Sequence, residues 1–139
     1  MMWWLTGDEH YNHSNIRTLF VFRDFPSTAA MNAELIKRHN ERVKPGHTVY
    51  HLGDFRLSTD GPNVHELIGM LNGNHVFIAG NHDRKNGLNT PLQFAVIKAF
   101  GRQIVLAHRP EDCNFIMGLL GIDLGFCGHV HEKWKFKTV

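Results

Sequence analysis

Short apolar runs recur along the chain, each stopping at or just before a Gly or an Ala. They are four or five residues long, contain many β-branched and aromatic side chains, and occupy residues 3–6, 48–52, 76–79, 104–107 and 124–127. Runs of this length, bounded by Gly or Pro, are typical of buried strands. The pattern therefore predicts five strands distributed over the chain.

Between these runs the apolar positions follow a helical period. Residues 28–43 predict a helix capped by Ser27 or Thr28, and residues 63–71 predict a second helix capped by Asn63. Residues 114–120 predict a short third helix. One face of the first helix carries Met31, Leu35, Ile36 and His39. We expect that face to cover the core.

The second half of the chain adds a hairpin to this pattern. Residues 94–100 and 103–107 predict two strands that turn at Gly101-Arg102. Residues 133–138 alternate lysine with Trp, Phe or Thr, which is typical of an edge strand with one lysine face. Strands that alternate with helices, together with a hairpin, indicate an α/β layered fold with a mixed sheet.

The composition restricts the class of protein. The length of 139 residues and the hydrophobic content of 42% indicate one folded domain, residues 1–139, and exclude intrinsic disorder. No apolar run approaches the roughly 18 residues of a membrane span, and the first is too short for a secretory signal. Two cysteines fit a reducing compartment, so we expect a cytoplasmic protein. The net charge of +2 does not indicate nucleic acid as a partner.

Histidine is unusually frequent, with 11 copies, and many of them follow the predicted strands. Ligands of α/β proteins bind outside the carboxyl ends of the strands. The side chains expected there are Asp8, His10, Asp54, Asn81, His82, His108, His129 and His131. In extended backbone, the side chains of residues two apart point the same way. Asp8 and His10 can therefore bind one ion as a pair, and so can His129 and His131. Asn81 and His82 are neighbours and should diverge.

These side chains are carboxylates, an amide and imidazoles, without a thiolate. Such ligands suit Mn, Fe, Zn or Ni better than a structural cysteine–zinc site. They are too many for one ion, but two ions about 3.5–4 Å apart that share a carboxylate would use them all. Two dications carry four positive charges, of which Asp8 and Asp54 neutralise two. The site would therefore attract an anion such as a phosphoester.

Five short motifs occur in order along the chain. They are Asp-x-His at 8–10, Gly-Asp at 53–54, Gly-Asn-His-Asp at 80–83, a lone His at 108 and Gly-His-x-His at 128–131. One such motif is weak evidence, whereas five in order after predicted strands are specific. The set resembles the signature of the calcineurin-like metallophosphoesterases. Residues 31–36 and 49–55 are further similar to the small bacterial and phage branch of that family.

This resemblance implies a four-layer α/β/β/α sandwich of two mixed sheets with a dinuclear metal centre. By motif position, it assigns the first metal to Asp8, His10 and His131. It assigns the second metal to Asn81, His108 and His129, and makes Asp54 the bridge between the two. It also implies that His82 acts as general acid or stabilises the leaving group, with Asp83 orienting its ring.

Arginines near the motifs are candidates to bind a substrate phosphate. Arg109 directly follows His108, and Arg56 lies shortly after Asp54, so these two are expected nearest the site. More distant candidates are Arg17, Arg23 and Arg84. For each of them taken alone, a solvated surface position is favoured.

Structural roles are expected for the remaining histidines and aromatic residues of interest. Surface or hydrogen-bonded positions are expected for His39, His47, His51, His65 and His75. His13 can support the first ligand pair, together with Asn12 and Asn15. Glu9 should point away from the metals, either toward solvent or into a supporting position behind the ligands. The core is expected to hold Phe20, Phe22, Phe25 and Cys127.

The most economical hypothesis is a metal-dependent phosphoesterase that prefers phosphodiesters, with manganese as the first choice of metal and a small phosphoester, such as a nucleotide, as substrate. One alternative is a phosphomonoesterase or nuclease that uses the same site. Another is a non-catalytic protein-binding scaffold of the same fold, like the retromer subunit that resembles this family. A scaffold has no need of a general acid, so His82 and Asp83 favour catalysis.

Overall fold

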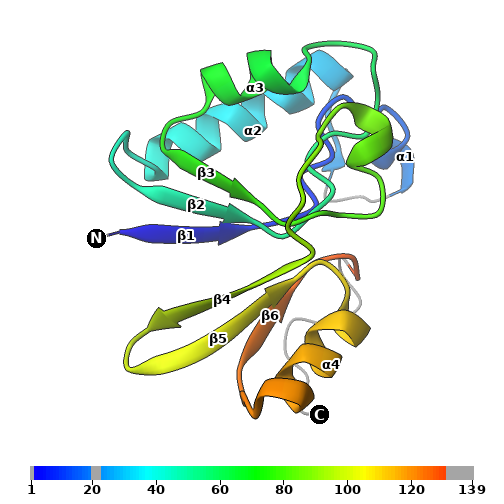
Figure 1. Ribbon diagram of the computed structural model, residues 1–139. Coiled ribbons are helices and arrows are strands. Elements are labelled where there is room, and N and C mark those ends of the chain that lie inside the picture. Colours follow the sequence, from blue (N-terminus) through cyan, green and yellow to red (C-terminus); the bar gives the residue numbers. More distant parts are fainter. Residues whose placement is uncertain (1, 20–22, 131–139) are drawn as a thin grey trace.

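The computed structural model describes residues 2–19 and 23–130, and its elements are labelled in Figure 1. The strands are β1 (Trp3–Thr6), β2 (Thr48–His51), β3 (Asn74–Phe77), β4 (Phe94–Ala99), β5 (Arg102–Ala107) and β6 (Gly125–Cys127). The helices are α1 (Ile16–Leu19), α2 (Thr28–Arg42), α3 (Val64–Met70), the short 3₁₀ helix η2 (Arg84–Asn86) and α4 (Pro110–Leu120). The strands predicted from the apolar runs are confirmed, with ends shifted by no more than two residues.

The strands form two three-stranded sheets. In the first sheet β2 lies between β1 and β3, and both neighbours are parallel to it. In the second sheet β5 lies between β4 and β6, antiparallel to the former and parallel to the latter. The expectation of two mixed sheets thus holds for the second sheet. The first is parallel over its described strands, because a helix forms each of its crossover connections.

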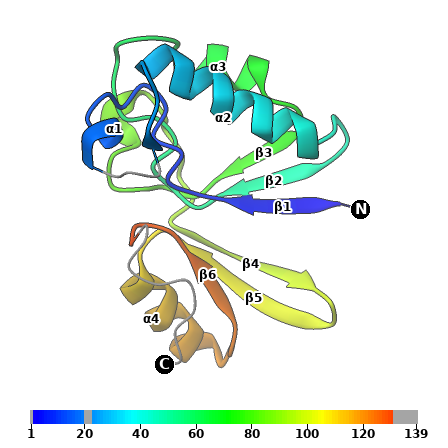
Figure 2. The ribbon, with the colours of Figure 1, turned by 180° about the vertical axis from the view of Figure 1, so that it is seen from behind.

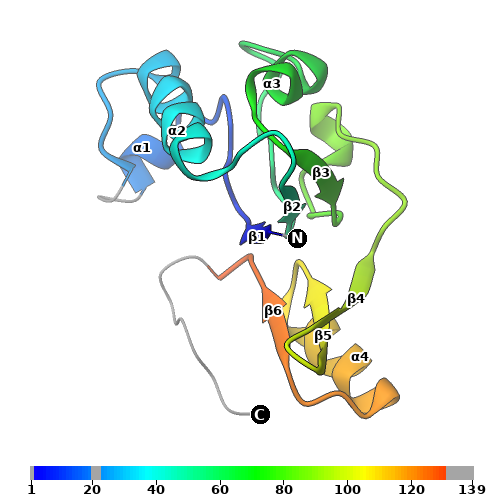
Figure 3. The same ribbon diagram turned by 90° about the vertical axis from the view of Figure 1, so that its left-hand side faces the viewer.

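The two sheets pack face to face between outer helices. α2 and α3 cover the outer face of the first sheet, and α4 covers the outer face of the second (Figures 1 and 3). The view from behind in Figure 2 shows the same order of layers. This is the expected α/β/β/α sandwich.

Three apolar clusters fill the spaces between these layers. Between the sheets lie Leu52, Ile78, Ile104 and Leu106, with Leu5 and Tyr50 packed against them. Between the first sheet and its helices lie Tyr11, Phe55, Leu67, Leu71 and Leu88. Between the second sheet and α4 lie Val105, Ala107, Cys113 and Ile122. Both faces of each sheet are therefore covered, which explains why most strands appear as nearly continuous apolar runs. The exception is β4, where Phe94, Val96 and Lys98 alternate with half-buried residues and are exposed.

Local capping fixes where the helices begin. Ser27 caps α2, because its hydroxyl accepts a hydrogen bond from the Ala30 amide at 3.0 Å. Asn63 and Glu66 form a reciprocal capping box at the start of α3. α4 begins at Pro110, four residues before the expected start, because proline is well tolerated at the first helical position.

The hairpin turns one residue earlier than expected. Phe100 and Gly101 occupy the turn with φ of 54° and 71°, and two central residues with positive φ match the twist of a hairpin. Among the described residues no helix has the length and apolar character needed to cross a bilayer. The edge strand expected at 133–138 lies outside the described residues, as do Phe20 and Phe22.

Candidate metal centre

The loops that follow β1 and β2 run side by side at one edge of the first sheet. Backbone hydrogen bonds continue the pairing of the two strands beyond their ends: the Asp8 amide donates to the Gly53 carbonyl at 2.9 Å, and the His10 amide donates to the Asp54 carbonyl at 3.0 Å. The same edge receives His108 from the end of β5 and His129 from beyond β6. The carboxyl ends of four strands therefore meet at one place.

Left-handed backbone brings the candidate metal ligands to this place. Asp8, His10, Asp54 and His129 have φ of 54°, 55°, 55° and 71°. Non-glycine residues rarely adopt this conformation, and when they do they cluster at functional sites held by the surrounding structure. The expected pairing of Asp8 with His10 along extended backbone is therefore wrong in its mechanism, although the two side chains do converge.

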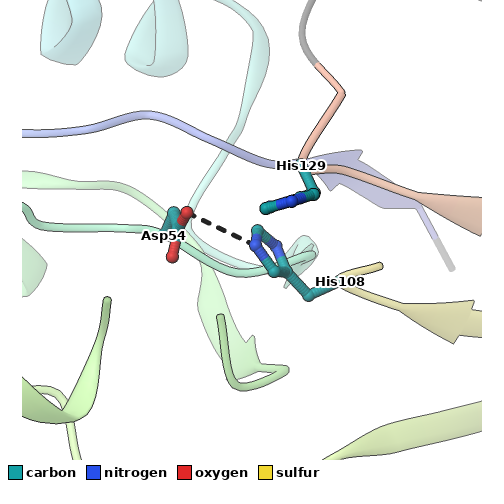
Figure 4. A group of neighbouring side chains, drawn as sticks. All are labelled: Asp54, His108 and His129. Atoms are coloured by element: carbon teal, nitrogen blue, oxygen red, sulfur yellow. Dashed lines mark ion pairs between the residues drawn. The ribbon is translucent and has the colours of Figure 1, made fainter. Parts of the chain in front are cut away.

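Two triads of candidate ligands share Asp54. One consists of Asp8, His10 and Asp54, and the other of Asp54, His108 and His129; in each triad the candidate atoms lie within 4.8 Å of one another. The Asp54 Oδ2 atom lies 3.3 Å from His108 Nε2 and 3.7 Å from His10 Nε2. Figure 4 shows the second triad around its carboxylate. Carboxylates and imidazoles in this arrangement fit a pair of divalent cations.

Electrostatic interactions keep the shared aspartate charged. Burial raises the pKa of Asp54. The hydrogen bond and charge of His108 lower it, as does the hydrogen bond from the His82 backbone N–H, and together they outweigh burial. The pKa of Asp54 therefore lies below its ordinary value. Burial lowers the pKa of His108, yet Asp54 outweighs burial and leaves this pKa above its ordinary value. Burial and the charge of His108 lower the pKa of His129. A bound cation would take the place of the proton on His108.

Two glycines allow this close approach. Gly53 has φ of 99°, and a Cβ on it would collide with the His108 imidazole. A Cβ on Gly80 would collide with the Asp54 amide and carboxylate. The His108 Nδ1 atom lies 2.8 Å from the Leu52 carbonyl, which turns Nε2 toward Asp54. The glycines of the Gly-Asp and Gly-Asn-His-Asp motifs are thus steric requirements of the site.

Asn81 and His82 diverge as expected. Asn81 Oδ1 lies 2.8 Å from His108 Nε2, so this amide joins the second triad. The His82 backbone N–H donates to Asp54 Oδ1 at 3.0 Å, while its ring is exposed and its centroid lies 6.5 Å from that of His10. His131, the remaining expected ligand, lies outside the described residues.

Asp83 ties the loop after β3 to the loop after β2. This carboxylate is 1% exposed. Its Oδ1 accepts a hydrogen bond from the Phe55 amide at 2.8 Å, and its Oδ2 accepts from the amides of Asp54 and Gly80 at 2.9 and 2.7 Å. None of these bonds comes from His82, so the expected orientation of that ring by Asp83 has no support in the described contacts. Asp83 instead holds the backbone that carries the shared aspartate.

The two arginines expected nearest the site occupy different environments. Arg56 is 5% exposed, and its guanidinium donates to the carbonyls of Pro62 and Asn86 at 3.0 and 2.8 Å. A guanidinium committed to these carbonyls holds loops together and is poorly placed for the expected binding of phosphate. Arg109 is half-buried at the N-cap of α4 and lines a cavity beside His108.

Comparison with known proteins places this geometry in a known fold. No protein-family model matches the chain. The uncharacterized protein MJ1445 of Methanocaldococcus jannaschii is 38% identical over 109 residues, which cover 78% of this chain and 58% of MJ1445. The chain thus spans less than two thirds of that relative.

Solved structures match over nearly the whole chain. The protein of unknown function AQ665 from Aquifex aeolicus has a TM-score of 0.76 at 24% identity, covering 99% of this chain and 82% of AQ665. Vps29 from Entamoeba histolytica, crystallised with Zn²⁺, has a TM-score of 0.56 at 21% identity, covering 100% of this chain and 69% of Vps29. The chain therefore has the fold of AQ665 and Vps29, in which two sheets pack between outer helices. The resemblance carried by the five motifs is therefore confirmed for the fold.

Within this fold, Arg23 stabilises the strained loop after β1. Its Nη1 donates to the Glu9 carbonyl and its Nη2 to the Asp8 carbonyl, both at 2.8 Å. Arg23 thus binds backbone rather than the substrate phosphate for which it was a candidate. No spacing in the sequence connects Arg23 with Asp8, because the contact depends on the path of the intervening loop.

A buried amide pair holds the same loop to α2. The backbone N–H of Asn12 donates to Asn32 Oδ1 at 3.0 Å, and the side-chain Nδ2 of Asn32 donates to Asn12 Oδ1 at 2.7 Å. Asn12 Nδ2 also donates to the carbonyls of Ser58 and Pro62. The expected supporting role of Asn12 is thereby explained, whereas Asn32 is a contact that sequence reasoning missed. His13 joins this support, with its Nδ1 3.0 Å from His10 Nδ1.

A series of hydrogen-bonded polar side chains runs from the candidate metal centre toward the helices. Glu9 Oε1 lies 2.6 Å from His51 Nδ1, and His51 Nε2 lies 2.9 Å from His75 Nδ1. Burial and the charge of His51 lower the pKa of His75 to about 4. The expected hydrogen-bonded role of these histidines is correct. Of the two positions expected for Glu9, the structure shows the supporting one, because the residue is 8% exposed and contacts His51.

Proposed function

We propose that the chain hydrolyses phosphoester bonds, with phosphodiesters as preferred substrates, at a centre of two divalent cations. The position of Asp54 carries this proposal, because its carboxylate belongs to both ligand triads, as a bridging ligand must. The donor set of carboxylate and imidazole fits Mn²⁺ first, and also iron, zinc or nickel. The Zn²⁺ complex of Vps29 supports a divalent cation in this fold.

The chain's residues divide between the two cations as the motifs imply. The first cation would be held by Asp8, His10 and His131, and the second by Asn81, His108 and His129. Asp54 would bridge the two. Five of these seven residues belong to the two triads, and Asn81 contacts His108, which supports the assignment.

The bound cations would lower the pKa of a water molecule and offset charge on the phosphoryl oxygens. The protein's own task is to hold its ligands in place before substrate arrives. Asp83 and the glycines 53 and 80 fix the backbone at Asp54, and the Leu52 carbonyl fixes the ring of His108. Such preorganisation is the main protein contribution to stabilising charge in a transition state.

His82 is the group that we propose as general acid. Its backbone is anchored to Asp54, and its exposed imidazole stands at the edge of the site. From that position the ring can donate a proton to the oxygen of a departing alcohol. Its exposure also leaves the ring accessible to a bound substrate.

The room beside the site favours a diester over a monoester. A diester carries a second ester group that must be accommodated next to the scissile phosphate. A cavity of about 400 Å³ opens beside Asn81 and His108, a volume within the range of small-molecule sites.

Metal analysis followed by a paired assay tests this proposal. Purified protein loaded with Mn²⁺ is offered bis(p-nitrophenyl) phosphate and p-nitrophenyl phosphate. We expect two Mn²⁺ per chain and faster hydrolysis of the diester. Asp54→Asn should lose both metal and activity, whereas the matched exposed variant Asp60→Asn should retain them. Hydrolysis of neither ester by fully metallated protein would contradict the proposal.

A non-catalytic scaffold is the second candidate, and one observation favours it. Phe115, Leu119 and Leu120 are exposed on α4 by 68%, 68% and 50%, an arrangement that suits contact with a partner protein. The same assay separates the two candidates, because a scaffold would bind metal without hydrolysing either ester.

A further inference from the structure

The cavity beside the second triad has polar walls of mixed character. The loop after β3 and η2 form one side, and the first turn of α4 forms another. Its polar lining includes Arg84, Asn89, Thr90, Gln93, Arg109 and Asp112. Asn81 and His108 line it too, so the cavity is continuous with the candidate metal centre.

The charged groups of this wall are not engaged elsewhere. Among the described residues, the side chains of Arg84, Arg109 and Asp112 form no hydrogen bond or ion pair with one another or with the rest of the protein. By contrast, Arg23 and Arg56 donate to backbone carbonyls. Two guanidinium groups and one carboxylate thus remain available to a ligand within one concave surface.

The combination of charges restricts the chemistry of that ligand. Two guanidinium groups suit a phosphate, which arginine can bind with two parallel hydrogen bonds. Asp112 would repel a ligand that is only an anion, but it can accept hydrogen bonds from hydroxyl or amino groups. The amides of Asn89 and Gln93 add both donors and acceptors. A nucleotide carries all of these groups: a phosphate, sugar hydroxyls and a polar base.

We propose that this cavity is a nucleotide subsite, which binds a nucleotide unit attached to the scissile phosphate. Arg84 and Arg109 bind the unit's own phosphate, and Asp112 binds its hydroxyl or amino groups. The proposal rests on the proposed phosphoesterase function only for the position of the scissile phosphate. With the dinucleotide pApA, water adds to the internal phosphorus and the bond to the 3′-oxygen breaks. The proton ends on that oxygen, which yields two molecules of AMP.

Equilibrium binding tests the subsite without any catalysis. The full chain is stripped of metal with EDTA and titrated calorimetrically with AMP and with adenosine. We expect AMP to bind at least tenfold more tightly than adenosine. Arg84→Ala and Arg109→Ala should each weaken AMP binding about tenfold, whereas Arg102→Ala, whose exposed side chain pairs with Asp123, should not. Equal affinities for the two ligands, or equal losses in all three variants, would overturn the proposal.

Turnover then separates the subsite from the proposed function. With Mn²⁺ present, pApA should be hydrolysed at least tenfold faster than ApA, which lacks the terminal phosphate, and Arg84→Ala should reduce that preference. If neither dinucleotide nor the aryl diester is hydrolysed but AMP binding depends on both arginines, the subsite stands and the proposed function fails. If the aryl diester is hydrolysed but the arginine variants bind AMP like wild type, the subsite fails and the function stands.

Discussion

Replacement of Asp83 by asparagine tests whether this residue fixes the backbone of the site. The carboxylate is buried, and its two oxygens accept three backbone hydrogen bonds of 2.7–2.9 Å. An asparagine of the same shape can present one oxygen to the amides of Asp54 and Gly80. Its amide group then faces the Phe55 N–H, so that a donor meets a donor.

The expected cost follows from these three bonds. Two bonds that lose the charge of their acceptor weaken by about 1 kcal/mol each, and one buried N–H left without a partner costs about 1–3 kcal/mol. Asp83→Asn should therefore lower the free energy of unfolding by about 3–5 kcal/mol. With a urea dependence of about 2 kcal/mol per molar, the unfolding midpoint should fall by about 2 M.

Urea unfolding monitored by circular dichroism measures this loss. Asp60→Asn makes the same chemical change at an exposed position and should shift stability by less than about 0.5 kcal/mol. If Asp83→Asn lies within 1 kcal/mol of wild type while the control behaves as stated, the assigned role of Asp83 is wrong. A loss of turnover without loss of stability would instead return Asp83 to the expected partnership with His82.

Three further predictions concern the site and its supports. Gly53→Ala should lower the free energy of unfolding by about 2 kcal/mol or more and weaken Mn²⁺ binding, because the φ of Gly53 is 99° and the new Cβ would collide with His108. The control Gly46→Ala places its Cβ in open space and should change neither quantity. His82→Ala should retain two metals by elemental analysis but hydrolyse esters with poor leaving groups about 10²–10⁴-fold more slowly; unchanged turnover would remove its role as general acid. Because the folded protein lowers the pKa of His75 to about 4, the unfolded chain binds the extra proton between pH 6.5 and 4, and stability should be lost as pH falls through that window. At pH 5 this loss is about 2 kcal/mol, and urea titrations should show a smaller pH dependence for His75→Phe; an identical dependence would contradict the assignment.

Local signals allowed much of this fold to be predicted from sequence. The strands, the Ser27 and Asn63 caps and the hairpin depend on residues close together in the chain. α4 was expected to begin later than it does, because its first turn is polar and its apolar period starts beyond Pro110. The parallel order of the first sheet follows from helical crossovers that the run pattern alone does not specify.

The ligands of the candidate site were predictable for a different reason. Asp8, Asp54 and His108 each follow a strand, and strand ends meet at one edge of an α/β fold. The supporting contacts were not predictable in this way. The bonds from Arg23 to the backbone, from Asn32 to Asn12, and from three amides to Asp83 depend on left-handed turns and loop paths. The family resemblance implied that Asp83 orients His82, whereas the carboxylate of Asp83 binds the backbone amides of Asp54, Phe55 and Gly80.

The bridging of two cations by Asp54 can be detected by electron paramagnetic resonance of the Mn²⁺-loaded protein. Two Mn²⁺ ions about 3.5–4 Å apart that share a carboxylate are spin-coupled and give a multiline spectrum distinct from that of isolated ions. We predict this spectrum for wild type and for Asp60→Asn, and its loss in Asp54→Asn. A spectrum of magnetically isolated ions in the wild-type protein, or no bound manganese, would show that Asp54 does not bridge two cations.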